Sequence, residues 1–275
     1  MRIATSILAV VDPRAQEFEP IRKPRSIAVG LLAWTCGALI AALCAWLQRA
    51  AELPALGDAP DLISENGKLT LAWIGTVGII VSGAGAITLV RPARHMSGRG
   101  SSLAVVGVML YVPLAMVYAY LHGSLDVGLP SVYFSRFPDP GRVGVRSVEL
   151  TLIVGVVLLL RMNARELAAR SAILRTGRVD RQTMYAVAVC AALGIVGDLV
   201  RLAAVGAEAA LSEILGITGV TIVALASVLL TMGLIGVAID CTRIARALLR
   251  SGRRLTSLVS MVDVARVNQH ADTAP

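Results

Sequence analysis

The chain has 275 residues, of which 56% are hydrophobic and only 16% charged, and its mean hydropathy is +0.74. A soluble domain of this size carries about 25% charged residues. The charges also crowd between long stretches that hold no ionisable group, which excludes a disordered chain, a disulfide scaffold and an ordinary soluble enzyme. The composition therefore predicts a polytopic membrane protein, but it does not indicate what the protein does.

The long apolar runs predict an all-α fold with six transmembrane helices. A bilayer core of about 30 Å is crossed by roughly 20 apolar residues in a helix, and five runs reach that length. A sixth run does so if its helix begins near Val143, or if Arg146 and Glu149 lie at the headgroup level. Because the runs are continuously apolar rather than alternating, helices are favoured over a barrel. In chain order, the predicted spans are 26–48, 69–90, 102–121, 143–160, 183–206 and 217–239.

The basic residues predict the orientation of these spans. The two tails and the loops after the second and fourth spans hold 20 of the 26 basic residues, whereas the other side holds five and Arg201 lies within a span. Basic residues gather on the cytoplasmic side of membrane proteins. We therefore expect a cytoplasmic segment over 1–25, a transmembrane domain over 26–240 and a cytoplasmic basic amphipathic tail over 241–275. The excess of arginine over lysine favours the cytoplasmic membrane of a bacterium.

The second and third spans carry signals for helix packing and bending. Small residues at a spacing of four let helix backbones approach closely, so this face of the second span is predicted to pack against another helix or a second copy. Pro113 lies in the middle of the third span and leaves the Met109 carbonyl without its helical partner, which predicts a kink. The small residues of the second span are Gly75, Gly78, Ser82, Gly83 and Gly85.

Asp198 and Arg201 are the strongest functional candidates, because ionisable residues within spans are rare and often mark a site or a pathway. Both lie in the outer part of the fifth span, at the predicted depth of Arg146 and Glu149. Tyr118, Tyr120 and His122, which close the third span, complete a candidate outward-facing vestibule for a polar or anionic ligand. The structural alternative is that Asp198 and Arg201, spaced i and i+3, neutralise each other while Arg201 reaches toward the headgroups.

Motifs for catalysis, cofactors and metals are missing from the sequence. The four cysteines lie within or at the end of apolar runs without ligand spacing, and the three histidines are scattered. We therefore expect no enzyme, no cofactor, no metal site and no nucleic-acid binding. The lipid bilayer is the expected partner, joined by a protein partner or a second copy. Basic amphipathic stretches over 161–175 and 255–267 fit anionic lipid headgroups, although helix ends that only fix orientation are the favoured interpretation.

Two functions stay open at this level. The first is a non-enzymatic membrane subunit, scaffold or anchor, which the missing catalytic motifs and the helix faces suited to partners favour. The alternative is a small transporter or ligand-binding membrane protein that uses the polar cluster around Asp198 and Arg201. An intramembrane enzyme acting on lipids ranks below both, since no acid–base or metal set is recognisable.

Overall fold

The computed structural model describes residues 24–52, 63–90, 98–123, 138–172 and 183–271, and its regular structure in these ranges is helical. Six helices are long and apolar enough to cross a membrane. This confirms the predicted all-helical, multi-pass architecture. The helices are α2 (Pro24–Glu52), α3 (Glu65–Val90), α4 (Gly98–Met109), α5 (Tyr111–Gly123), α6 (Pro140–Ala172), α7 (Thr183–Val205) and α8 (Ala209–Ala271).

The third span consists of two helices, α4 and α5, which meet at Leu110. Pro113 has no backbone N–H, so the Met109 carbonyl cannot receive its helical hydrogen bond. Bonds from Leu110 N to the Val106 carbonyl and from Leu114 N to the Leu110 carbonyl, both 3.1 Å, carry the chain across the break. The break lies where the sequence predicts a kink.

The fourth span begins earlier than the sequence pattern predicts, at Pro140 rather than near Val143. Asp139 caps this helix, since its Oδ2 accepts a hydrogen bond of 2.9 Å from the backbone N–H of Arg142. Pro140 then occupies the first helical position, where its missing N–H costs nothing. The early start places Arg146 and Glu149 inside the helix, between its first turns and its apolar centre.

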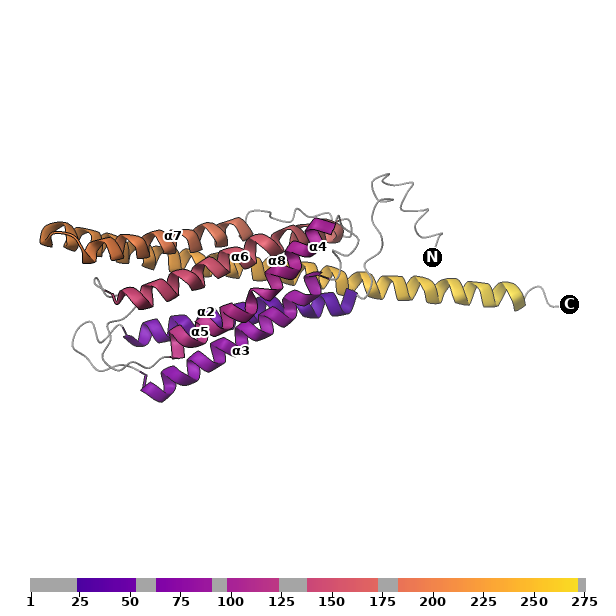
Figure 1. Ribbon diagram of the computed structural model, residues 1–275. Helices are drawn as coiled ribbons and strands as arrows, with labels where there is room; N and C mark the ends of the chain where they lie inside the picture. Colours follow the sequence, from indigo (N-terminus) through magenta and orange to yellow (C-terminus); the bar gives the residue numbers. More distant parts are fainter. Residues whose placement is uncertain (1–23, 53–62, 91–97, 124–137, 173–182, 272–275) are drawn as a thin grey trace.

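The last span is part of one helix of 63 residues. The sequence pattern separates a span over 217–239 from an amphipathic segment over 255–267, whereas α8 runs without interruption from Ala209 to Ala271. No proline occurs in this stretch, and so nothing in it removes a backbone donor and ends the helix. In Figure 1, α8 extends well beyond the other helices.

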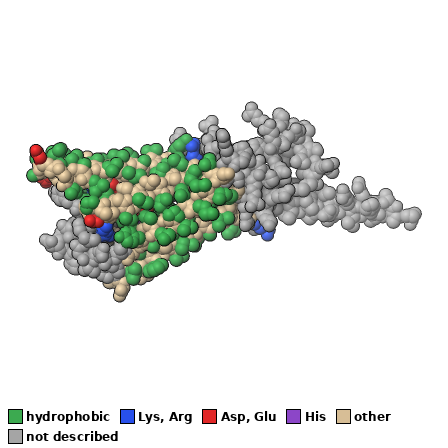
Figure 2. Space-filling view, in the orientation of Figure 1, with side chains coloured by type: hydrophobic (Ala, Val, Ile, Leu, Met, Phe, Trp, Pro, Cys, Tyr) green, Lys and Arg blue, Asp and Glu red, His purple; other side chains and the backbone are tan. Residues whose placement is uncertain are grey.

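The spans form a closed ring around the centre of the bundle. α2 packs on α3 and α8, α7 packs on α8 and α6, and α5 packs on α3 and α6 (Figure 1). α4 continues the span of α5 and also packs on α6. Hydrophobic side chains cover much of the face shown in Figure 2, with charged side chains gathered toward its ends. Such a surface suits a bilayer, where apolar atoms face lipid and charges face the headgroups.

The small residues of α3 contact two different helices. Gly78, Ser82 and Gly85 lie against α2: a Cβ on Gly37 of α2 would overlap the Gly78 carbonyl oxygen, and one on Gly85 would overlap the Trp34 backbone. Gly75 and Gly83 instead make room for the tyrosine side chains of α5. These small residues therefore let α3 approach the backbone of α2 on one side and the aromatic rings of α5 on the other.

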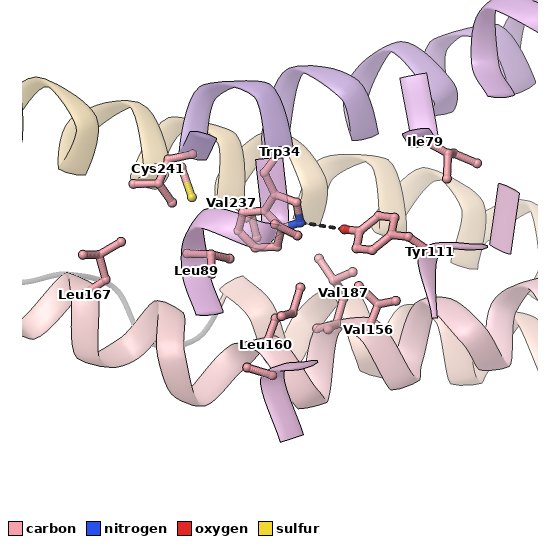
Figure 3. Close-up of a cluster of buried hydrophobic side chains, with 14 of the residues drawn as sticks. Trp34, Ile79, Leu89, Tyr111, Val156, Leu160, Leu167, Val187, Val237 and Cys241 are labelled. Carbon is pink, nitrogen blue, oxygen red and sulfur yellow. Dashed lines mark hydrogen bonds between the residues drawn. The ribbon is translucent and has the colours of Figure 1, made fainter. Parts of the chain in front are cut away.

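A cluster of buried apolar side chains joins the helices of the bundle (Figure 3). Its polar atoms bond to one another, since Trp34 Nε1 donates to Tyr111 Oη at 2.6 Å. Ser82 Oγ donates to the Trp34 carbonyl oxygen at 2.7 Å. These bonds remove the penalty of burying indole and phenol groups away from water. The remaining side chains labelled in Figure 3 are Ile79, Leu89, Val156, Leu160, Leu167, Val187, Val237 and Cys241.

The glycine contacts predict opposite effects for one substitution at two helical positions. Gly37→Ala forces α2 away from Gly78 and should lower the free energy of unfolding by about 1–3 kcal/mol. Gly144→Ala in α6 meets nothing within 4 Å and should leave stability unchanged or raise it by up to about 1 kcal/mol. Unfolding in mixed detergent micelles measures both, and equal effects would contradict the packing described for α2 and α3.

Candidate functional site

Buried polar residues from four helices meet at one end of the bundle, named here the Arg146 end. α6 contributes two of them, and α2, α5 and α7 supply the rest. Burying charge in a span is costly unless each charge is paired. The members are Gln48 and Arg49 of α2, His122 of α5, Arg146 and Glu149 of α6, and Asp198 and Arg201 of α7; all but Arg49 are buried.

Asp198 is the centre of the charged group. Its Oδ1 accepts hydrogen bonds from Arg146 Nη1 at 3.1 Å and from Arg201 Nη1 at 3.3 Å, so one carboxylate neutralises part of the charge of two guanidinium groups. Asp198 Oδ2 is also buried and has no hydrogen-bond partner among the described residues. The carboxylate therefore ties α6 to α7 through a single oxygen.

The structural alternative expected Arg201 to reach toward the headgroups. Its side chain instead lies inside the bundle. Its exposed fraction is 0%, the same as that of Asp198. The side chain passes over Gly219 of α8, where a Cβ would overlap the Arg201 Cγ atom. The missing side chain at Gly219 is thus what allows Arg201 to lie inside the bundle.

A second group links α2, α5 and α6 at the same end. His122 Nδ1 lies 2.6 Å from Gln48 Oε1, and His122 Nε2 lies 3.8 Å from Glu149 Oε1. Gln48 Nε2 donates to the backbone carbonyls of Lys68 and His122 at 2.8 and 3.2 Å. The imidazole also stacks on Tyr118, with ring centroids 4.2 Å apart. Arg146 and Glu149, one turn apart on α6, therefore join the two groups.

A cavity of about 150 Å³ lies inside the ring and touches this network. Arg49, Arg146 and Glu149 are the charged residues of its wall. Apolar and small side chains of α2, α6, α7 and α8 form most of the remainder, extending to Trp34 and Val237. Concave, mostly apolar sites with a few placed polar groups are typical of small-ligand binding.

The structure brings together most residues of the predicted vestibule. Asp198, Arg201, Arg146 and Glu149 belong to one network, and Tyr118 lines the cavity with its Oη donating to the Ala41 carbonyl at 2.9 Å. Tyr120 is 62% exposed and lies outside the cavity wall. Asp198 and Arg201 are also absent from the wall, and Asp198 is connected to it by its hydrogen bond from Arg146.

Sequence reasoning placed His122 among the vestibule residues but missed Gln48 and Arg49 as members of this site. Each lies in the last turns of a span, where polar residues ordinarily face the membrane surface. The available signal was that the first and third spans end at the same side as Arg146, which makes contact among their ends possible. It could not show which of these side chains turn inward.

The cysteines form no disulfide with one another: all four are free, and Cys190 lines the cavity. Among the described residues, no group of three or more histidine, cysteine, aspartate or glutamate side chains could hold a metal ion.

Comparison of the chain with known protein families, with curated proteins and with solved structures found no match.

The network predicts that Asp198→Asn is strongly destabilising. Removing the carboxylate charge leaves the guanidinium groups of Arg146 and Arg201 buried together, which should lower the free energy of unfolding by about 3 kcal/mol or more. Detergent unfolding of the purified protein is the measurement.

Asp240 provides the matched control, because it pairs with Arg243 at the same i,i+3 spacing but with Arg243 62% exposed. Asp240→Asn should change stability by less than about 1 kcal/mol. Similar losses for the two variants would contradict the structural role assigned to Asp198.

Proposed function

We propose that this protein binds a small ligand in the cavity of its membrane-spanning bundle. The observation that carries the proposal is the cavity itself, which side chains of all six spans line and which Arg49, Arg146 and Glu149 border at one end. Of the two functions left open by the sequence, this geometry supports the transporter or ligand-binding alternative.

The residues take different roles under this proposal. Arg49, Arg146 and Glu149 line the cavity and are the groups that contact the ligand. Asp198 and Arg201 lie behind the wall, where Asp198 holds Arg146 through its 3.1 Å bond, and are positioning residues. Binding inside a bundle between membrane-spanning helices is the arrangement that transporters use, so uptake or export of the ligand is the activity we propose.

A second candidate, a subunit or anchor for another protein, is favoured by α8. This helix continues to Ala271 and extends well beyond the other helices (Figure 1). A helix of that length beyond the bundle offers a surface for a protein partner or, through the basic residues of its sequence, for anionic lipid headgroups.

One purification tests both candidates. The chain is isolated from native membranes, and released small molecules and co-purifying proteins are identified by mass spectrometry. We expect a small molecule that is retained by the wild type and lost in Ala42→Phe, because the larger side chain at this lining position fills part of the cavity. Ala192→Phe on the exposed face of α7 is the control and should retain it.

The same profile of small molecules in all three proteins would contradict ligand binding in the cavity. A stoichiometric protein that is retained in all three and lost on truncation after Arg250 would instead support the second candidate. Gel filtration of Ala42→Phe shows whether its bundle stays intact.

We also propose that the chain lies in a bacterial cytoplasmic membrane with both ends in the cytoplasm. Support comes from the 20 basic residues on one side against five on the other. Because the number of spans is even, the two ends of the chain lie on the same side of the membrane. The Arg146 end then faces outward.

Reporter fusions test this orientation. Green fluorescent protein fused after Pro275 should fluoresce, and alkaline phosphatase fused between α2 and α3 should be active. Phosphatase fused between α3 and α4 is the control and should be inactive. Activity reversed between the two phosphatase fusions would place the Arg146 end on the cytoplasmic side.

A further inference from the structure

His122 is a buried imidazole that neighbouring side chains hold in one orientation. It belongs to α5, and its side chain is 3% exposed. The ring stacks on Tyr118, with centroids 4.2 Å apart. Gln48 of α2 contacts both the ring and the backbone carbonyl of His122. The two ring nitrogens therefore face different groups, because Nδ1 lies against Gln48 and Nε2 faces Glu149 of α6.

The amide of Gln48 determines which ring nitrogen carries a hydrogen. Gln48 Nε2 lies 2.8 Å from the Lys68 carbonyl oxygen and 3.2 Å from the His122 carbonyl oxygen. Carbonyl oxygens only accept hydrogen bonds, so the amide nitrogen must face them and Gln48 Oε1 must face the imidazole. Oε1 is itself only an acceptor, and it lies 2.6 Å from His122 Nδ1. Nδ1 therefore carries a hydrogen and donates it to Gln48.

This hydrogen leaves the other ring nitrogen in conflict with Glu149. In a neutral imidazole that is protonated on Nδ1, Nε2 is an acceptor, and an ionised carboxylate also only accepts. His122 Nε2 and Glu149 Oε1 are 3.8 Å apart, and both side chains are largely shielded from solvent. Two acceptors that face each other away from water are costly, because neither has the hydrogen that the contact needs. One additional proton, on Nε2 or on the carboxyl group, turns this repulsion into attraction.

Other charged and titratable groups surround this pair. Arg49 and Arg146 act on the charge of Glu149. Because arginine keeps its proton in folded proteins, these two residues contribute to the local charge but do not exchange protons. The part of the cavity wall that α8 supplies holds no ionisable side chain. The remaining groups are Lys68 of α3, which meets Gln48 through its carbonyl, Tyr118 of α5, and Asp198 and Arg201 of α7, which lie behind Arg146.

We propose that His122 and Glu149 form a buried proton-binding site, in which one proton is held between Nε2 of the imidazole and the carboxylate. Gln48 is a positioning residue, because it keeps the other ring hydrogen on Nδ1. Carboxylates and histidines inside spans form the proton relays of pumps and transporters. Glu149 lines the cavity, whereas His122 is not among the lining residues. Gain or loss of the proton therefore changes the charge at the cavity wall by one. This inference goes beyond the proposed function and does not depend on a ligand.

Nuclear magnetic resonance of the histidine nitrogens tests the site directly. The full chain, with its three histidines isotope-labelled on nitrogen, is studied in lipid nanodiscs at neutral pH, and His122→Gln shows which signals belong to His122. We expect a hydrogen on both ring nitrogens of His122. An infrared band of a protonated carboxyl group that Glu149→Gln removes would equally support the proposal, since the proton then rests on the acid. A bare ring nitrogen in His122 together with no such band would overturn it.

Removing the acid should remove the hydrogen from Nε2 but not from Nδ1. Glu149→Gln keeps the size of the side chain and removes its charge, so His122 should become neutral with its hydrogen on Nδ1, where Gln48 accepts it. Asp240→Asn is the control, because it removes the carboxylate of a different pair, and it should leave the His122 signals unchanged. A hydrogen on Nε2 alone in Glu149→Gln would contradict the role given to Gln48. Gel filtration shows whether the variants are folded, and the wild-type spectrum decides the proposal by itself.

The outcomes distinguish this inference from the proposed function. If the wild type holds no proton between His122 and Glu149 but retains a small molecule that Ala42→Phe loses, the cavity binds a ligand and only this inference fails. If the proton is found but the profile of small molecules is the same in the wild type and Ala42→Phe, the proton-binding site stands and the proposed function fails.

Discussion

The need to neutralise charge inside a bilayer organises one end of this protein. Asp198 is fully buried and accepts hydrogen bonds from Arg146 and Arg201 through one oxygen, which fixes the rotation of α6 against α7. With Arg146 turned toward α7, Glu149 one turn later reaches His122 of α5. His122 in turn contacts Gln48 of α2. Because each charge is tolerated only with its partner, the network sets how four helices meet.

The sizes of the residues at the helix–helix contacts determine how closely the other helices pack. α2 and α3 approach closely where Gly37 lies against Gly78, and α7 and α8 do so where Gly197 and Gly219 leave room. Between α3 and α5, the side chains of Tyr118 and Tyr111 occupy the space that Gly75 and Gly83 leave open. Without a hydrophobic force between helices in lipid, contacts of this kind supply most of the association energy. Tight pairs joined through bulky residues close a ring but leave a cavity at its centre.

Asp198 and Arg201 can stabilise the fold and also contribute to a functional site. Their own role is structural, because neither residue borders the cavity. Its effect on the site passes through Arg146, whose guanidinium it holds at the wall. The same network that joins the helices thus also borders the cavity, through Arg146 and Glu149.

The sequence alone determined the helical class, the six spans and the depth shared by Arg146, Glu149, Asp198 and Arg201, since apolar length and charge position depend on the bilayer and not on neighbouring helices. It could also predict the break near Pro113, which follows from a missing N–H. The start of α6 at Pro140 and the unbroken course of α8 follow local signals, the Asp139 cap and the absence of proline, which the lengths of the apolar runs do not register. The sequence could not predict the inward turn of Gln48 and Arg49 or the outward turn of Tyr120. Only the tertiary structure decided these, because the rotation of each helix depends on which partners its side chains meet, and a cavity belongs to the ring rather than to any one span.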